Sequence, residues 1–161
     1  MTALKTCLEA QGYTEVKTVI ASGNVIVHSE KPAKTIRRDI EALLPKQFKL
    51  DSELVKVLVL TPKQIASVIK NKPKGFGETP SKFHSDAIFL IDITLASAMK
   101  VFQPKEGVDA IWKGKGVIYS RRLSAKRTHS RLGKIVGTAA YKCMTIRSWN
   151  TTVKLHDLVS K

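Results

Sequence analysis

Apolar residues along the chain recur first at helical and then at strand spacing. In residues 2–11 they stand three and four positions apart, which predicts a helix, and Gly12 ends it. Short β-branched runs at 16–20 and 25–27 flank the turn residues Ser22-Gly23-Asn24. This arrangement predicts a β-hairpin.

The next segment again alternates between helical and strand spacing of its apolar residues. Pro32 stands at the start of a helix whose apolar stripe runs over residues 36–44. The run Leu54–Leu60 is apolar almost throughout, which predicts a strand covered on both faces. Thr61-Pro62-Lys63-Gln64 has the pattern of a capping box with proline at the first helical position, so we expect another helix there.

The composition changes in the middle of the chain. Proline and glycine interrupt the apolar periodicity across residues 73–85. We therefore expect a linker loop at 73–85, between an N-terminal α+β subdomain at 1–72 and a basic C-terminal one at 86–161.

The second half starts again with a strand, at 87–91, and Thr94 caps the helix that follows. A hairpin is predicted over 109–120, with a turn made of lysine and glycine. The polar stretch 123–132 carries only a thin apolar stripe, so a helix there is one interpretation. Ser148 caps a last helix.

The two halves have nearly the same order of elements. The first is αββαβα, and the second is βαββα followed by an unassigned stretch and a final helix. One strand placed before the first half makes them agree, which predicts an α+β protein of two packed ferredoxin-like βαββαβ subdomains. The first strand of the N-terminal one would be missing. Because that strand is central, we expect the true start to lie upstream; a rearranged first half is the alternative.

Charge is unevenly distributed along the chain. Lys and Arg number 28 against 13 Asp and Glu, a net charge of +15. Residues 113–161 contribute +11 of this, with Asp157 as their single acid. Such a field attracts polyanions, which favours a surface for nucleic acid. A solvated basic face and a site for small phosphorylated or carboxylated ligands are the alternatives.

Composition excludes several other classes of protein. A hydrophobic fraction of 43% is typical of a globular protein with a core. No apolar run approaches the roughly 20 residues of a membrane span, and the start of the chain does not resemble an export signal. Cys7 and Cys143 lie far apart without metal-ligand spacing, as in a reducing compartment. We expect a cytoplasmic protein with no membrane partner.

Candidate anion-binding residues come from two places. The densest basic run would carry like charges at i, i+4 if it were helical, which an anion would offset, although a solvated loop tolerates such a run as well. The entry of the last helix offers backbone N–H groups to an anion, whereas the structural alternative makes Trp149 a core anchor beside the Ser148 cap. The candidates are Arg121, Arg122, Lys126, Arg127, Arg131, Arg147, Trp149 and Asn150.

Motifs for catalysis and cofactors were sought without success. Neither a Gly-x-Gly-x-x-Gly helix entry nor a P-loop is present. The histidines lack zinc-ligand spacing, so we predict no metal and no cofactor. Asp86 and Asp92 are interpreted as strand-end and turn residues, and Cys143 as a buried thiol. Lys113–Ser120 matches an RNA-recognition strand at its small and basic positions but lacks the stacking aromatic residues.

Two segments carry a family resemblance. Ser22-Gly23-Asn24-Val25-Ile26 follows a strand, and Met144–Leu155 is similar to a Thr-x-Arg-Asn-Trp-Asn-Thr helix entry, with Ser148 replacing the usual Asn. Both resemble the bacterial family known as domain of unknown function 1697. Members usually begin with a strand and an Arg-Gly-Ile-Asn-Val-Gly-Gly loop, which this sequence lacks. The resemblance implies two packed α+β subdomains and brings no established reaction.

Two functions of different classes follow from these observations. The first is a non-catalytic binding module for nucleic acid or another polyanion, which uses the basic C-terminal half. The alternative is an enzyme or sensor for a small phosphorylated or carboxylated ligand, held between the subdomains near Arg147 and Asn150.

Overall fold

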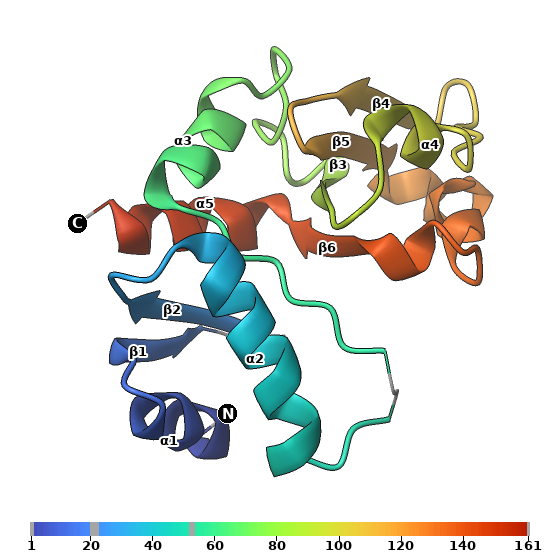
Figure 1. The fold of residues 1–161 in the computed structure, drawn as a ribbon. Coiled ribbons are helices and arrows are strands. Elements are labelled where there is room, and N and C mark those ends of the chain that lie inside the picture. Colours follow the sequence, from blue (N-terminus) through green and yellow to red (C-terminus); the bar gives the residue numbers. More distant parts are fainter. Residues whose placement is uncertain (1, 20–22, 52–53, 161) are drawn as a thin grey trace. The chain divides into compact units, whose positions relative to one another are not determined.

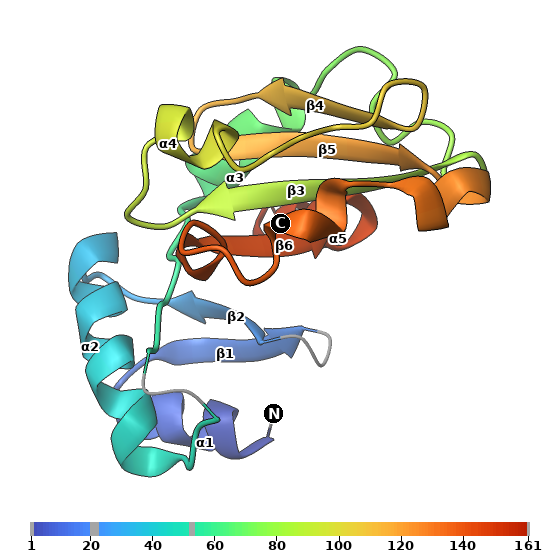
Figure 2. The ribbon, with the colours of Figure 1, turned by 90° about the vertical axis from the view of Figure 1, so that its right-hand side faces the viewer.

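Figures 1 and 2 show the chain as a computed structural model that describes residues 2–19, 23–51 and 54–160. The chain forms two compact units, Met1–Val59 and Leu60–Lys161. Helices and antiparallel strands occur in both units, which confirms the predicted α+β class. Within the described ranges, no helix is both long enough and apolar enough to cross a membrane.

The first unit is a β-hairpin with two helices. Its core joins Leu8, Val16 and Ile36, which come from three different elements. The predicted first helix, the strands of the hairpin and the helix after Pro32 are confirmed, while residue 22 of the hairpin turn lies outside the described residues. The elements are α1 (Thr2–Ala10), β1 (Thr14–Val19), β2 (Asn24–His28) and α2 (Ala33–Gln47).

The prediction of a strand at Leu54–Leu60 was wrong, because the structure assigns no strand to these residues and neither sheet includes them. An apolar run alone does not separate a paired strand from a segment that packs without pairing. Val59 packs against the core of the first unit, and the backbone N–H of Val57 donates to Glu41 Oε1 at 2.7 Å. A carboxylate thus accepts a backbone donor that a neighbouring strand would have paired.

The second unit is built on a four-stranded sheet in which every neighbouring pair is antiparallel. The strand order is β4-β5-β3-β6. Its helices and strands are α3 (Pro62–Lys70), β3 (Phe83–Leu90), α4 (Leu95–Met99), β4 (Asp109–Lys113), β5 (Val117–Leu123), β6 (Met144–Ser148) and α5 (Trp149–Val159). Between β5 and β6 the chain makes three 3-10 turns, η1 (Ser124–His129), η2 (Leu132–Ile135) and η3 (Tyr141–Cys143).

Alternation along the strands gives this sheet two different faces. Ile88 and Ile118 are paired across β3 and β5, and they pack with Phe102 and Ile135 in one core cluster. Tyr119 points to the opposite face, since neighbouring side chains on a strand alternate. There its hydroxyl donates to the backbone carbonyl oxygen of Val68 in α3 at 2.8 Å.

The linker predicted at 73–85 lies inside the second unit. Phe76 in this segment is completely buried, and its ring packs edge-on against Tyr119 and Trp149, at centroid distances of 5.3 and 5.1 Å. These contacts bind the segment to the sheet of the second unit. The structure therefore divides before α3, after Val59, whereas the sequence indicated a division after α3.

Several boundaries in the second unit differ from the prediction. β3 begins at Phe83, so residues 83–85 are strand, and Asp86 lies inside the strand instead of at its end. β6 was not predicted. The possible helix at 123–132 is the end of β5 followed by 3-10 turns.

The predicted helix caps are confirmed. Thr61 Oγ1 accepts from the N–H of Gln64 at 3.3 Å, and the Gln64 side chain accepts from the N–H of Thr61 at 2.8 Å, which completes the capping box. Ser148 Oγ likewise accepts from the N–H of Thr151 at 3.3 Å, at the start of α5.

Candidate functional site

The residues predicted to bind anions all lie in the second unit, but they do not share one surface. Arg121 and Arg122 are neighbours on β5, so their side chains point to opposite faces of the sheet. Lys126, Arg127 and Arg131 lie in or beside the 3-10 turns that follow. The other three surround the junction of β6 and α5.

Arg121 packs against aromatic rings. Its guanidinium carbon lies 4.1 Å from the ring centroid of Phe83 and 5.2 Å from that of Trp112. A cation over an aromatic face is attracted by the ring quadrupole. Arg121 is half-buried, so its guanidinium is engaged with these rings and only partly open to solvent.

Arg122 faces a carboxylate. Its Nη2 lies 3.9 Å from Asp86 Oδ2, and His84 Nε2 lies 3.0 Å from Asp86 Oδ1. Burial raises the pKa of Asp86, while the neighbouring His84 and Arg122 act to lower it. Because β3 starts earlier than predicted, Asp86 is a strand residue that partly compensates the charge of Arg122.

Lys126, Arg127 and Arg131 are exposed. The interpretation of this stretch as a helix, in which cations would share a face at i, i+4, was wrong, because the chain forms 3-10 turns, where the repeat is three residues. Their exposure makes them the most accessible of the predicted cations, since Arg121, Arg122 and Arg147 are half-buried.

Hydrogen bonds join the backbone of the basic segment, residues 121–134, to residues in and beside the sheet. The N–H of Ser124 donates to the carbonyl oxygen of Lys82 at 3.0 Å, and the N–H of Arg131 donates to Asp109 Oδ2 at 2.8 Å. Burial alone would raise the pKa of Asp109, but the hydrogen bonds from backbone N–H groups of Lys105 and Arg131 hold it below its usual value. Asp109 is therefore charged at neutral pH and fixes where the segment leaves the sheet.

Arg147 is engaged by its own strand. Its Nη1 donates to Thr145 Oγ1 at 2.8 Å and to the carbonyl oxygen of Ile146 at 2.9 Å. The side chain is half-buried, and this burial lowers the pKa of the guanidinium. These bonds hold the Arg147 side chain against the end of β6, just before the helix starts.

Trp149 and Asn150 begin α5 and differ in their surroundings. Trp149 is buried, with its indole over Gly77, where a Cβ would overlap the ring. Asn150 is exposed. The close approach of Gly77 is what lets the indole pack so near the loop after α3.

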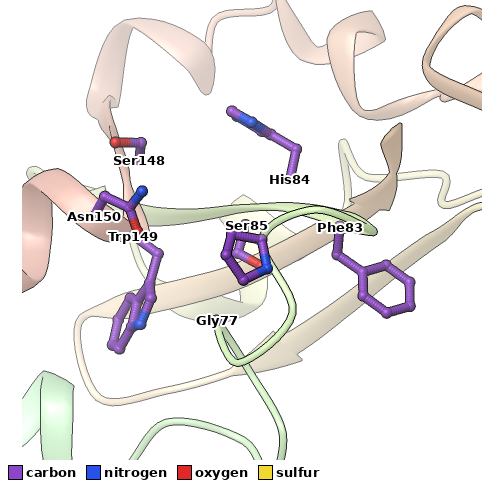
Figure 3. A pocket seen from close by; sticks show the side chains of 8 residues that line it. Gly77, Phe83, His84, Ser85, Ser148, Trp149 and Asn150 are labelled. Carbon is purple, nitrogen blue, oxygen red and sulfur yellow. The ribbon is translucent and has the colours of Figure 1, made fainter. Parts of the chain in front are cut away.

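A small pocket lies beside these two residues (Figure 3), with a volume of about 110 Å³. It forms because β6 ends at Ser148, opposite Asp86, so that residues 83–85 have no strand neighbour on this side among the described residues. The lining residues are Gly77, Pro80, Phe83, His84, Ser85, Ser148, Trp149 and Asn150.

Sequence reasoning found only part of this pocket. Trp149 and Asn150 were predicted as site residues, whereas 83–85 were assigned to the linker. The available signal was the absence of glycine and proline after Pro80, together with the strand-favouring Phe83. Both features allow β3 to begin before Asp86.

In the described part of the chain, no group of three or more His, Cys, Asp and Glu side chains is placed to hold a metal ion. The polar groups around the pocket are hydroxyl, amide, indole and imidazole groups. Hydroxyl, amide and imidazole groups can donate or accept hydrogen bonds, whereas the indole N–H only donates.

The sequence profile of the family described as "Protein of unknown function (DUF1697)" matches residues 1–119. The chain belongs to the DUF1697 family. The matched region includes the segment Ser22–Ile26, whereas the helix entry at 144–155 lies beyond it. No curated protein matches this DUF1697 member.

The fold of this DUF1697 protein is similar to that of a solved structure. It is a conserved bacterial protein, SP0830 from Streptococcus pneumoniae, with a TM-score of 0.78 and 17% sequence identity. The similarity covers 100% of this chain and 89% of that chain. At this identity the likeness concerns the fold alone.

Proposed function

We propose that this DUF1697 protein binds nucleic acid or another polyanion without catalysing a reaction. The proposed interface is the basic segment, defined as residues 121–134. The observation that carries the proposal is that Lys126, Arg127 and Arg131 have exposed side chains and form no ion pair with an acidic side chain of the described residues.

The cations of the first unit contrast with this. Lys31 Nζ lies 3.2 Å from Asp39 Oδ2, and Arg37 Nε lies 2.9 Å from Glu41 Oε1. The first unit has 9 basic and 7 acidic residues, whereas the second has 19 and 6, a net charge of +13. Charge of one sign concentrated in this way raises the local concentration of a polyanion.

Arg121 and Arg122 contribute to the proposed interface mainly through the electrostatic field of their positive charges. Both are half-buried, one against aromatic rings and the other beside Asp86. Replacing them would disturb packing as well as charge, so a clean test leaves them in place. The remaining proposed residues, Arg147, Trp149 and Asn150, belong to the junction of β6 and α5.

The test compares binding of a short single-stranded RNA and of a matched unstructured polyanion at several salt concentrations. In the triple variant Lys126→Ala, Arg127→Ala, Arg131→Ala, we expect weaker RNA binding. The slope of log affinity against log salt should become shallower by about 2, since each lost phosphate contact contributes roughly 0.7 for a single strand.

The matched control removes three exposed lysines of the first unit, Lys17→Ala, Lys34→Ala and Lys46→Ala, and so changes the net charge equally. An equal loss of RNA binding in both triple variants would contradict an interface at the basic segment. If the affinities for RNA and for the polyanion fall in parallel as the salt concentration rises, the protein recognises only the negative charge of its ligand. That result would refute the nucleic-acid interface.

We also infer that the second unit is a ferredoxin-like βαββαβ unit in which 3-10 turns replace the second helix. The support is its strand order, β4-β5-β3-β6, with all neighbours antiparallel and α4 between the first two strands in sequence.

Cys7 and Cys143, which are thiols and form no disulfide, favour a reducing compartment such as the cytoplasm.

The alternative function, binding of a small phosphorylated or carboxylated ligand near Arg147 and Asn150, has support at one of these residues. Asn150 lines the pocket of Figure 3, whereas Arg147 is not among the lining residues and bonds within its own strand.

A further inference from the structure

The face of the second unit's sheet that carries Tyr119 is closed at its centre. The rings of Phe76 and Trp149 lie edge-on to each other at a centroid distance of 5.1 Å, and both pack edge-on against Tyr119. All three side chains are buried. This aromatic cluster belongs to the core, so a ligand reaches this face only outside the cluster.

Three planar side chains extend the same face and stay partly open to solvent. They come from adjacent strands, Trp112 from β4, Arg121 from β5 and Phe83 from the start of β3, and each is half-buried. Arg121 is two residues from Tyr119 on β5, and Trp112 is its partner in register, so these side chains share its face. Figure 3 shows the ring of Phe83 directed away from Trp149.

The guanidinium joins the two rings into one row. Its carbon lies 4.1 Å from the ring centroid of Phe83 and 5.2 Å from that of Trp112. We call these three residues, Phe83, Arg121 and Trp112, the aromatic row. Both kinds of planar group on which unpaired nucleobases stack, aromatic rings and arginine planes, are therefore present side by side.

The aromatic row adjoins the basic segment. Arg121 belongs to both, and Phe83 is the register partner of Leu123. The N–H of Ser124 donates to the carbonyl oxygen of Lys82 at 3.0 Å, which fixes the segment beside the start of β3. A nucleic-acid backbone held by the exposed cations of the segment thus has a planar surface for its bases within the same unit.

The electrostatic surroundings of Phe83 also suit a nucleotide. Lys82 is exposed, and its Nζ lies 5.4 Å from the ring centroid of Phe83. An exposed cation over a ring is worth less than a stacked base, so a base can displace this ammonium, which then lies near a phosphate. Asp86 points to the opposite face of β3, where Arg122 lies, and so does not border the row.

Pairing between distant strands supplies what the sequence motif lacks. Lys113–Ser120 matches an RNA-recognition strand at its small and basic positions but has no aromatic residues at the stacking positions. In the folded sheet, Trp112 lies directly before this motif, and β3 brings Phe83 to the same face. Rings are thus available beside the motif, although from other positions.

We propose that the aromatic row binds an unpaired base of a single-stranded nucleic acid, stacked on the ring of Phe83, while the basic segment holds the adjoining phosphates. This inference rests on the proposed function and names its ligand more closely. Arg121 acts as a positioning residue, because its guanidinium lies over the Phe83 ring and continues the stack toward Trp112.

The test compares a short oligouridylate with abasic RNA of the same length, at physiological ionic strength, by fluorescence anisotropy of labelled RNA. The two have the same phosphates, so a difference in affinity comes from the bases. We expect oligouridylate to bind about tenfold more tightly, the contribution of one stacked base. Phe83→Leu should abolish this preference, because leucine keeps an apolar side chain without an aromatic face.

The affinity of Phe83→Leu for abasic RNA should equal that of the wild type, which also shows that the variant is folded. The matched control is Phe48→Leu, since Phe48 is a half-buried phenylalanine of the first unit beside an exposed lysine, Lys49. This control should keep the full preference for oligouridylate. A loss of preference in Phe48→Leu equal to that in Phe83→Leu would overturn the proposal.

An NMR measurement detects the contact itself. In the complex with oligouridylate, we expect nuclear Overhauser effects between the uracil ring protons and the ring protons of Phe83, which a purely structural role of this ring would not produce. Their absence at saturation would overturn the stacking. Oligodeoxyuridylate distinguishes the sources of the base: weaker binding identifies RNA and equal or tighter binding includes DNA, and both outcomes support the row.

The outcomes also separate this inference from the proposed function. Equal affinity of the wild type for oligouridylate and abasic RNA would overturn the aromatic row, while polyanion binding by the basic segment would stand. Absence of binding to either RNA would overturn both proposals. The triple variant of the basic segment should lose affinity for both RNAs by the same factor, because the aromatic row is intact in it.

Discussion

Gly77 shows how one residue shapes both the core and the pocket. Its φ angle is +77°, in the left-handed region, and a Cβ at this position would overlap the indole of Trp149. Glycine is the residue that meets both conditions, because it has no Cβ and reaches positive φ at low cost. The absence of a side chain at Gly77 therefore allows the close packing of loop and helix.

Substitution of Gly77 should separate these two effects. Gly75 is the matched control, since its φ is +73° and no atom lies within 4 Å of where its Cβ would be. We expect Gly75→Ala to lower the free energy of unfolding by about 1 kcal/mol through backbone strain. Gly77→Ala should cost about 3 kcal/mol, since overpacking is added. Urea denaturation followed by circular dichroism measures both, and equal losses would show that the indole simply moves aside.

At the scale of elements, the start of α3 is the clearest case in which sequence determines local structure. Thr61 and Gln64 make the two reciprocal bonds of the capping box, and Pro62 occupies the first helical position. Thr61→Ala removes the side-chain acceptor and should lower the free energy of unfolding by about 1 kcal/mol. Thr61→Ser keeps the hydroxyl and should lose much less. Urea denaturation compares the variants, and similar losses would assign the effect to the methyl group instead of the cap.

Helix ends were predictable because capping is a local matter of a few neighbouring residues. The caps at Thr61 and Ser148 were both readable from the sequence and are both present. Strand pairing is not local, since it depends on which segment lies alongside. This is why Leu54–Leu60 was assigned to a strand that does not form, and why β6 was overlooked.

The same distinction explains what was missed at the site. Trp149 and Asn150 were found because a helix entry is a local signal for anions. Ser85 was assigned to the linker, because β3 extends past the end of β6 at this residue, and no spacing in the sequence reveals where a neighbouring strand ends. The predicted cations Arg121 and Arg122 were separated by the alternation of a strand that extends to Leu123, three residues beyond its predicted end.

At the scale of the whole molecule, the sheets of the two units differ in how many neighbouring strands hydrogen-bond to each strand. β3 in the second unit is paired on both sides, with β5 and with β6. The hairpin of the first unit has two strands, and its register is interrupted between Thr14 and Lys17. Two-stranded sheets are marginal by themselves, so the hairpin depends on its packing against α1 and α2.

This difference should be visible in native-state hydrogen exchange. The amides of the β3–β5 ladder, around Ile88 and Ile118, lie in the most completely buried part of the second unit and should exchange slowest. Hydrogen-bonded amides of β1 and β2 should exchange at least about tenfold faster, which corresponds to about 1.4 kcal/mol less local stability. Exchange followed by NMR after transfer to D₂O measures both in one sample, so each sheet serves as the control for the other. Equal rates in the two sheets would mean that the units open together in one cooperative step, and that the hairpin draws its stability from the whole chain.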